Sequence, residues 1–148
     1  MMNLRQRQKC KTQFKESELR VIIRDLAEIL SYLHESRVVH LDVKPDNILL
    51  RNKNKKPQYI LADYSIATQL EALDQQEDII EGDARYLAPE LLNFEQPKGL
   101  DLTSADVYSL GMTVFELMRG KHSFLSLFFV FFIRFFGFWY PSWSPLRK

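Results

Sequence analysis

The chain has 148 residues, of which 46% are hydrophobic and 26% are charged, and its formal net charge at pH 7 is +1. This length and composition suit one globular domain, and the near-neutral charge gives no global field for nucleic acid or an anionic membrane, so no nucleic-acid partner is expected. A single cysteine, Cys10, excludes an internal disulfide, and the N-terminus has no apolar stretch typical of a signal peptide.

The first predicted element is a helix. Residues 1–15 are polar and basic, and we expect a disordered lead-in there. From Glu16 to about Glu35 apolar residues recur at helical spacing, which predicts an amphipathic helix that packs on a core.

Short strands are expected next, at residues 38–39, 48–50 and 59–61. The polar, proline-containing residues 40–47 predict a loop, and residues 52–57 predict the turn of a hairpin between the last two strands. Residues 69–83 are acidic and lack periodicity, which predicts a mobile loop.

A second helix is expected after residue 102. Residues 103–106 read Thr-Ser-Ala-Asp, which is close to a capping box, and the helix that they open is apolar over most of its circumference. Two helices with very short strands between them indicate an α+β fold.

Residues 40–47 read His-Leu-Asp-Val-Lys-Pro-Asp-Asn, and this order of polar side chains after a strand is specific. The segment resembles the catalytic loop of protein kinases, whose phosphoryl transfer needs an oriented hydroxyl, a cation on the transferring group and oxygen ligands for magnesium. This resemblance implies that Asp42 orients the hydroxyl and takes its proton, that Lys44 neutralises the phosphoryl group and that Asn47 binds the metal. The alternative is a surface loop with one carboxylate and one lysine.

These residues resemble the H-R-D-x-K-x-x-N catalytic loop of eukaryotic-type protein kinases. The resemblance implies ATP and Mg²⁺ as cofactors, with Leu49 in the apolar floor under the adenine. It also places Asp63, in Ala-Asp-Tyr-Ser, at the D-F-G position that binds magnesium. Tyr64 keeps the aromatic residue of that motif, whereas Ser65 replaces its glycine and removes backbone freedom.

Two later motifs follow in the family's order. Residues 82–90 read Gly-Asp-Ala-Arg-Tyr-Leu-Ala-Pro-Glu and resemble the end of an activation segment that closes on A-P-E. Asp106 is the first residue of an Asp-Val-Tyr-Ser-Leu-Gly segment that resembles the family's D-x-W-S-x-G motif. The aspartate of that motif accepts hydrogen bonds from backbone N–H groups of the catalytic loop. The alternative for Asp106 is a plain helix-capping carboxylate. Asp83 stands at a position where a carboxylate would need a cation, and we expect Lys44 as that cation, with Arg85 as the alternative.

Leu41 and Asp83 indicate the group within the family. Leu41 replaces the arginine that clamps an activation-loop phosphate, which makes regulation by such a phosphate less favoured. The Gly-Asp-Ala-Arg-Tyr-Leu-Ala segment and His-Leu-Asp-Val-Lys-Pro are similar to the Wee kinases. This resemblance implies a protein substrate, with a cyclin-dependent kinase and its inhibitory tyrosine or threonine as the candidate, and a place in the cytoplasm or nucleus. The alternatives are a divergent serine/threonine kinase and a kinase-like binding module or pseudokinase fragment.

The resemblance covers residues 16–120, which we interpret as a partial kinase domain, mainly the helical C-lobe with short β-hairpins. The chain contains no Gly-rich loop and no V-A-I-K lysine. We therefore expect the N-lobe to be absent and the chain, as a truncated product, to be weakly active or inactive.

Residues 121–148 form an aromatic-rich tail that we expect to lie outside the kinase fold. Eight of the eleven phenylalanines and both tryptophans follow Lys121. Residues 124–140 fit a membrane anchor, a core helix or a segment that is not evolved protein, namely translated intron or frame-shifted sequence. The last alternative is favoured, because Arg134 interrupts the apolar run and neither caps nor a polar face accompany it. A membrane partner is expected only if this segment is a true anchor.

Overall fold

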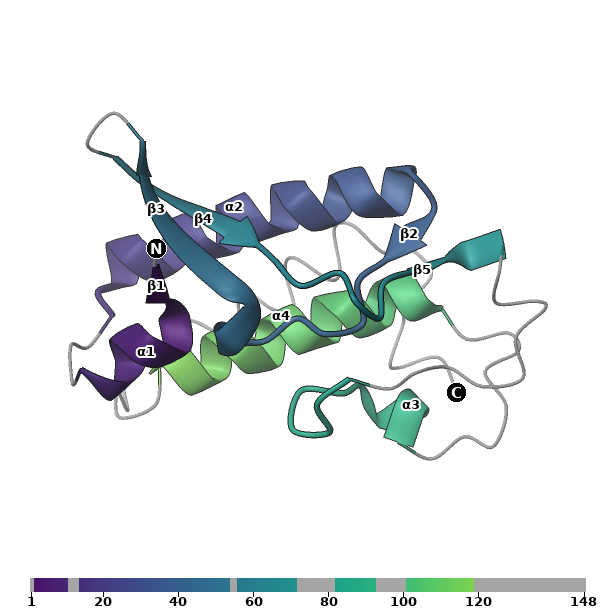
Figure 1. Cartoon of the computed structure of the whole chain (residues 1–148). Coiled ribbons are helices and arrows are strands. Elements are labelled where there is room, and N and C mark those ends of the chain that lie inside the picture. The colour runs from purple at the N-terminus through teal and green to yellow at the C-terminus, as the bar shows by residue number, and fades with distance from the viewer. Residues whose placement is uncertain (1, 11–13, 54–55, 72–81, 93–100, 119–148) are drawn as a thin grey trace, which may run out of the picture. The chain divides into compact units, whose positions relative to one another are not determined.

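The structure is a computed structural model that describes residues 2–10, 14–53, 56–71, 82–92 and 101–118 (Figure 1). The chain divides into two units, Met1–Leu117 and Met118–Lys148, and the account below concerns the first. The expectations for residues 121–148, including the three alternatives for 124–140, lie outside the described residues. Among the residues that are described, no helix combines the length and apolarity needed to cross a membrane.

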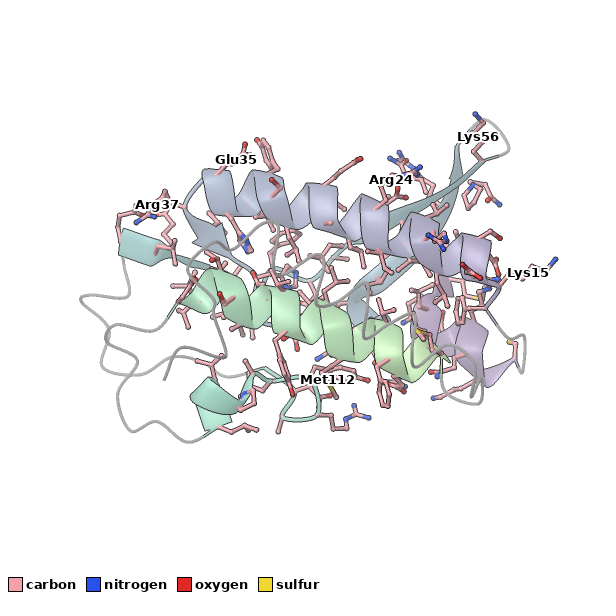
Figure 2. All side chains as sticks on the ribbon, turned by 180° about the vertical axis from the view of Figure 1, so that it is seen from behind. Lys15, Arg24, Glu35, Arg37, Lys56 and Met112 are labelled. Carbon is pink, nitrogen blue, oxygen red and sulfur yellow. The ribbon has the colours of Figure 1, made fainter. Side chains whose placement is uncertain are left out.

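Helix α2 (Glu16–Glu35) has the bounds that the apolar spacing predicts. It begins where the Glu18 side chain accepts a hydrogen bond from the Lys15 N–H at 2.9 Å. Its buried side chains recur at helical spacing and are Leu19, Ile22, Leu26 and Leu30. In Figure 2, Lys15 and Glu35 mark the two ends of this helix. The prediction of an amphipathic core helix is confirmed.

The predicted hairpin is also present, with longer strands than expected. Strands β3 (Ile48–Lys53) and β4 (Lys56–Leu61) pair antiparallel, and the short β1 (Met2–Asn3) adds to the other edge of β3, giving the order β1-β3-β4. Alternate residues Tyr59 and Leu61 are buried. The Asp25 side chain of α2 accepts the Tyr59 N–H at 3.0 Å, which fixes the helix against β4.

The first predicted strand, at residues 38–39, lies in a separate two-stranded sheet. Strand β2 (Val38–Val39) pairs antiparallel with β5 (Thr68–Gln69), so Gln69 lies in a strand where a mobile loop is expected. Leu70 packs against a buried cluster of apolar residues. The cluster includes residues of the catalytic loop, of the short α3 (Pro89–Leu92) and of α4, namely Val39, Leu41, Leu87, Ala88, Leu91, Leu102 and Ala105. Residues 72–81 of the expected loop lie outside the described part of the chain.

Helix α4 (Leu102–Met118) is the predicted buried helix, but its cap differs from the prediction. The Asp101 side chain accepts the N–H groups of Thr103 at 3.1 Å and Ser104 at 3.4 Å. Asp101 therefore fills the capping role, because an aspartate before the helix reaches the unpaired N–H groups of the first turn. Asp106 lies inside the helix and is fully buried.

The expected disordered lead-in at residues 1–15 is wrong for the residues that the structure describes. Residues 4–9 form helix α1 (Leu4–Lys9), and Asn3 and Gln6 make a reciprocal capping box at its start. A helix of this length is unstable alone, so its order depends on tertiary contacts. Leu4 is fully buried, and Figure 1 shows α1 beside the end of α4. The architecture is a mixture of helices and short antiparallel strands, as the α+β class requires.

Candidate active site

Residues 40–47, the loop that is predicted to be catalytic, are held in place by α4. Asp106 accepts the N–H groups of His40 at 2.8 Å and Leu41 at 2.7 Å. His34, in the last turn of α2, places its Nε2 2.9 Å from the same carboxylate. A buried carboxylate is tolerated only when several donors satisfy it, and here three do. The prediction that Asp106 accepts N–H bonds from this loop is therefore confirmed, and the capping alternative is wrong.

Asp42, Lys44 and Asn47 are in direct contact. Asp42 Oδ2 lies 2.7 Å from Lys44 Nζ and accepts a 2.7 Å hydrogen bond from Asn47 Nδ2. Asn47 Nδ2 also donates to the Asp42 backbone carbonyl at 2.9 Å. Asn47 lies in the short 3₁₀ helix η1 (Pro45–Asn47) and is largely buried. Because the amide nitrogen faces Asp42, the amide oxygen remains as an acceptor for a cation.

Asp63 follows β4 after one residue, Ala62, and its segment lies beside this loop. The Ala62 N–H donates to the Asn47 carbonyl at 2.9 Å, which joins the two segments. Asp63 has a positive φ of 66°, an uncommon conformation for a residue other than glycine. Hydrogen bonds from Ser65 lower the pKa of Asp63, with a smaller effect from the charge of Lys44. Asp63 is therefore an ionised, exposed carboxylate on the segment that is joined to Asn47 through Ala62.

Leu49, the expected floor of the adenine site, lies on β3. It is half-buried and pairs with Asn3 of β1, opposite Ile60 of β4. Leu49 and Ile60 share one face of the sheet, because residues directly opposite in an antiparallel pair lie on the same face. The structure therefore places the apolar side chain of Leu49 two residues after Asn47, the last residue of η1.

The expected ion pair between Lys44 and Asp83 is wrong, and the alternative partner is the one observed. Arg85 contacts both Asp83 oxygens, with Nε 2.9 Å from Oδ1 and Nη2 2.6 Å from Oδ2. Lys44 is held by Asp42 instead, and a guanidinium two residues away offers a forked contact that an ammonium cannot make. The Arg85 hydrogen bonds lower the pKa of Asp83 to about 2.

Gly82 brings the end of the activation segment onto the catalytic loop. A Cβ at this position would lie 2.3 Å from the Leu41 carbonyl oxygen and 3.0 Å from Asp42 Oδ1. Only glycine allows that approach, because a real Cβ does not come so close to backbone. The next residue, Asp83, directs its N–H toward Asp42 Oδ1 at 3.4 Å. Asp42 is thus flanked by Lys44 and Asn47 on one oxygen and by the 82–83 backbone on the other.

The sequence motifs did not predict what surrounds His40. Its ring is buried and meets Tyr64 edge to face, with the ring centroids 4.9 Å apart. Burial lowers the pKa of His40, against the opposing effect of the Asp106 charge, so the ring is neutral at pH 7. Its Nδ1 faces the Asp42 N–H at 3.3 Å. Tyr64, which stands where the family has phenylalanine, therefore packs on the loop that carries Asp42.

The donor set fits a hard cation such as magnesium. Magnesium prefers oxygen ligands and keeps waters or phosphate oxygens in its coordination shell. Asn47 Oδ1 and the Asp63 carboxylate supply such oxygens on adjacent segments. Among the described residues, His, Cys, Asp and Glu form no group of three that could hold a metal ion.

The arrangement of Asp42, Lys44 and Asn47 in one loop beside the Asp63 segment is the one that the resemblance to protein kinases implies. Comparison with known proteins agrees: the protein kinase domain profile matches residues 1–127. The chain belongs to the protein kinase family, and the predicted resemblance to this family, with Wee kinases among the relatives, is confirmed.

Similar proteins include two plant kinases and an animal one. The chain is 43% identical over 106 residues to a Wee1-like protein kinase of Arabidopsis thaliana, covering 72% of this chain and 19% of that protein. It is 43% identical over 91 residues to a Wee1-like protein kinase of Oryza sativa subsp. japonica, covering 62% and 16%. It is 34% identical over 116 residues to human death-associated protein kinase 2, covering 78% and 30%. The chain thus spans less than a third of the length of each of these relatives.

Proposed function

We propose that this kinase domain transfers the γ-phosphoryl group of ATP to a protein hydroxyl, with Asp42 as the catalytic base. The observation that supports this most is the contact of Asp42 with Lys44 and Asn47, on a loop whose backbone is fixed by buried Asp106. A base must be held in place to accept a proton from an oriented hydroxyl. In this proposal Asp42 orients the acceptor hydroxyl and takes its proton.

The other reactant, ATP with magnesium, is held in this proposal by Lys44, Asn47, Asp63 and Leu49. Magnesium, when bound, neutralises charge on the phosphate oxygens, and Asn47 and Asp63 would hold it. Lys44 stabilises negative charge on the transferring group beside Asp42. Leu49, half-buried on β3, contributes to the apolar surface under the adenine.

We further propose a Wee-like substrate, namely a tyrosine or a neighbouring threonine of a cyclin-dependent kinase, in the cytoplasm or nucleus. Its support is the Gly-Asp-Ala-Arg-Tyr-Leu-Ala segment and the similarity to Wee1-like protein kinases. The described residues then belong to the C-lobe of the kinase fold. Because residues 1–148 contain no Gly-rich loop and no V-A-I-K lysine, we expect this chain alone to transfer phosphate weakly or not at all.

The test is a chimaera in which residues 1–127 replace the matching segment of the Arabidopsis Wee1-like protein kinase. Asp42→Asn should lower kcat about 10²–10⁴-fold, the usual size of a general-base effect, with little change in stability. Glu16→Gln, which removes an exposed carboxylate on α2, should leave kcat unchanged and serves as the matched control. An active chimaera whose kcat is insensitive to Asp42→Asn would remove Asp42 from the role of base.

A further inference from the structure

Arg5 makes the densest set of polar contacts on α1, although it belongs to none of the motifs. Its side chain is 15% exposed, and Nε lies 3.0 Å from Asp46 Oδ2. Nη1 contacts Glu116 and lies 3.2 Å from Gln8 Oε1. Nη2 contacts the Tyr86 hydroxyl and lies 3.3 Å from the second Glu116 oxygen. All three guanidinium nitrogens therefore have partners, and these partners come from four segments.

Two of these partners belong to the segments that flank Asp42. Asp46 lies in η1 immediately before Asn47, whose amide contacts one Asp42 oxygen. Tyr86 follows Asp83, whose N–H points to the other Asp42 oxygen, and the Tyr86 N–H donates to the Asp83 carbonyl at 2.9 Å. Arg5 thus connects the two segments between which the carboxylate of Asp42 lies.

The charges around Arg5 require a cation. Asp46 and Glu116 both face it, and hydrogen bonds from Arg5 and Tyr86 outweigh burial and lower the pKa of Glu116. Burial and the neighbouring Glu116 raise the pKa of Tyr86 to about 12, so its hydroxyl keeps its proton and donates to Glu116. Without Arg5, Asp46 and Glu116 would both lose the guanidinium that contacts them.

We propose that Arg5 is a positioning residue that holds η1 and the end of the activation segment at a fixed separation around Asp42. Through Asp46 it fixes the segment that carries Lys44 and Asn47, and through Tyr86 it fixes the backbone at Asp83. A guanidinium suits this task because its planar fork contacts two groups at once, whereas an ammonium is a point charge. The inference rests on the proposed role of Asp42, but its test needs no phosphoryl transfer.

Arg7 offers a matched control on the same helix. Its side chain is 14% exposed, close to the 15% of Arg5, and its Nη2 lies 2.5 Å from Glu18. It also lies 4.5 Å over the Phe14 ring, and its Nη1 lies 3.4 Å from the Tyr59 hydroxyl. Both arginines therefore help to hold α1, but Arg7 faces α2 and β4 whereas Arg5 faces the catalytic loop.

Amide hydrogen exchange, followed residue by residue by NMR in the 148-residue chain, distinguishes the two roles. Asn47 N–H, bonded to Lys44 at 3.0 Å, and Tyr86 N–H report on the segments beside Asp42. Glu18 N–H, bonded to Lys15 at 3.1 Å, reports on the Arg7 side. Arg5→Ala should speed exchange at the first two amides about tenfold, a local loss of pairing, and leave Glu18 nearly unchanged. Arg7→Ala should give the opposite pattern.

Two further variants keep the test decisive. Arg5→Lys should restore protection at no more than one of the two amides beside Asp42. If Arg5→Ala does not fold, Asp46→Asn should speed exchange at Asn47 but not at Tyr86, and Glu116→Gln the reverse. The proposal would be overturned if Arg5→Ala and Arg7→Ala each speeded hydrogen exchange equally at the Asn47, Tyr86 and Glu18 amides. That result would show that Arg5 only docks α1. A chimaera whose kcat is insensitive to Asp42→Asn would overturn the proposed role of Asp42 but would leave this exchange pattern unaffected.

Discussion

Asp106 and Arg5 are two charged residues that hold the candidate site. They lie in two helices, α4 and α1, which are stabilised in different ways. Asp106 is inside a 17-residue apolar helix, is fully buried and accepts N–H groups of the loop directly. Arg5 is on a six-residue helix and contacts the site only through side chains. The long helix has an apolar pattern that specifies it locally, whereas the short one needs its tertiary partners. The candidate site therefore depends on a motif residue and also on a residue that lies outside every motif.

The largest effect is expected on the Asp106 side. Asp106→Ala leaves the N–H groups of His40 and Leu41 buried without an acceptor, which should lower the free energy of unfolding by about 3–5 kcal/mol. Urea denaturation measures this loss. Asp101→Ala, which removes an exposed cap at the start of the same helix, is the control and should cost about 1 kcal/mol. An Asp106→Ala effect no larger than that of Asp101→Ala would contradict the view that the loop depends on Asp106.

A smaller effect is expected on the Arg5 side. Arg5→Ala removes a partly exposed ion pair and leaves Glu116 and Asp46 without the cation that contacts them, so it should lower the free energy of unfolding by about 1–3 kcal/mol. Adding Glu116→Gln to Arg5→Ala should cost little more, because the two residues lose one shared interaction. Urea denaturation of both single variants and the double variant measures the coupling. Strictly additive effects would show that Arg5 and Glu116 act independently.

The smallest effect concerns Asp83, which lies near Asp42 but is neutralised by neither Arg5 nor Lys44. Its pKa is lowered from 3.8 to about 2, chiefly by the hydrogen bonds from Arg85. A depressed pKa contributes stability above the unfolded value, and this contribution is lost as the pH falls from about 4 toward about 2. Arg85→Ala should return the Asp83 pKa toward its usual range, as measured by NMR titration of the carboxyl carbon. If the pKa stays near 2, Lys44 and not Arg85 is the effective cation.

The sequence alone determined the elements whose signals are local. Helical spacing gave the bounds of α2, and the alternation of apolar runs and turn residues predicted β2 and the β3–β4 hairpin. The order of the motif residues predicted that Asp42, Lys44 and Asn47 share one loop and that Asp106 supports it. These predictions succeeded because period, turn chemistry and motif spacing are properties of neighbouring residues.

Only the tertiary structure decided which groups pair when several compete. Asp83 had two candidate cations, and the contact of Lys44 with Asp42 left Arg85 as its partner. Residues 1–15 carry no periodic signal, and α1 is ordered because Leu4 is buried and Arg5 meets carboxylates that lie far from it in the sequence. Such pairings depend on distances set by the whole fold. A sequence pattern states which charges exist, but burial and geometry decide which of them meet.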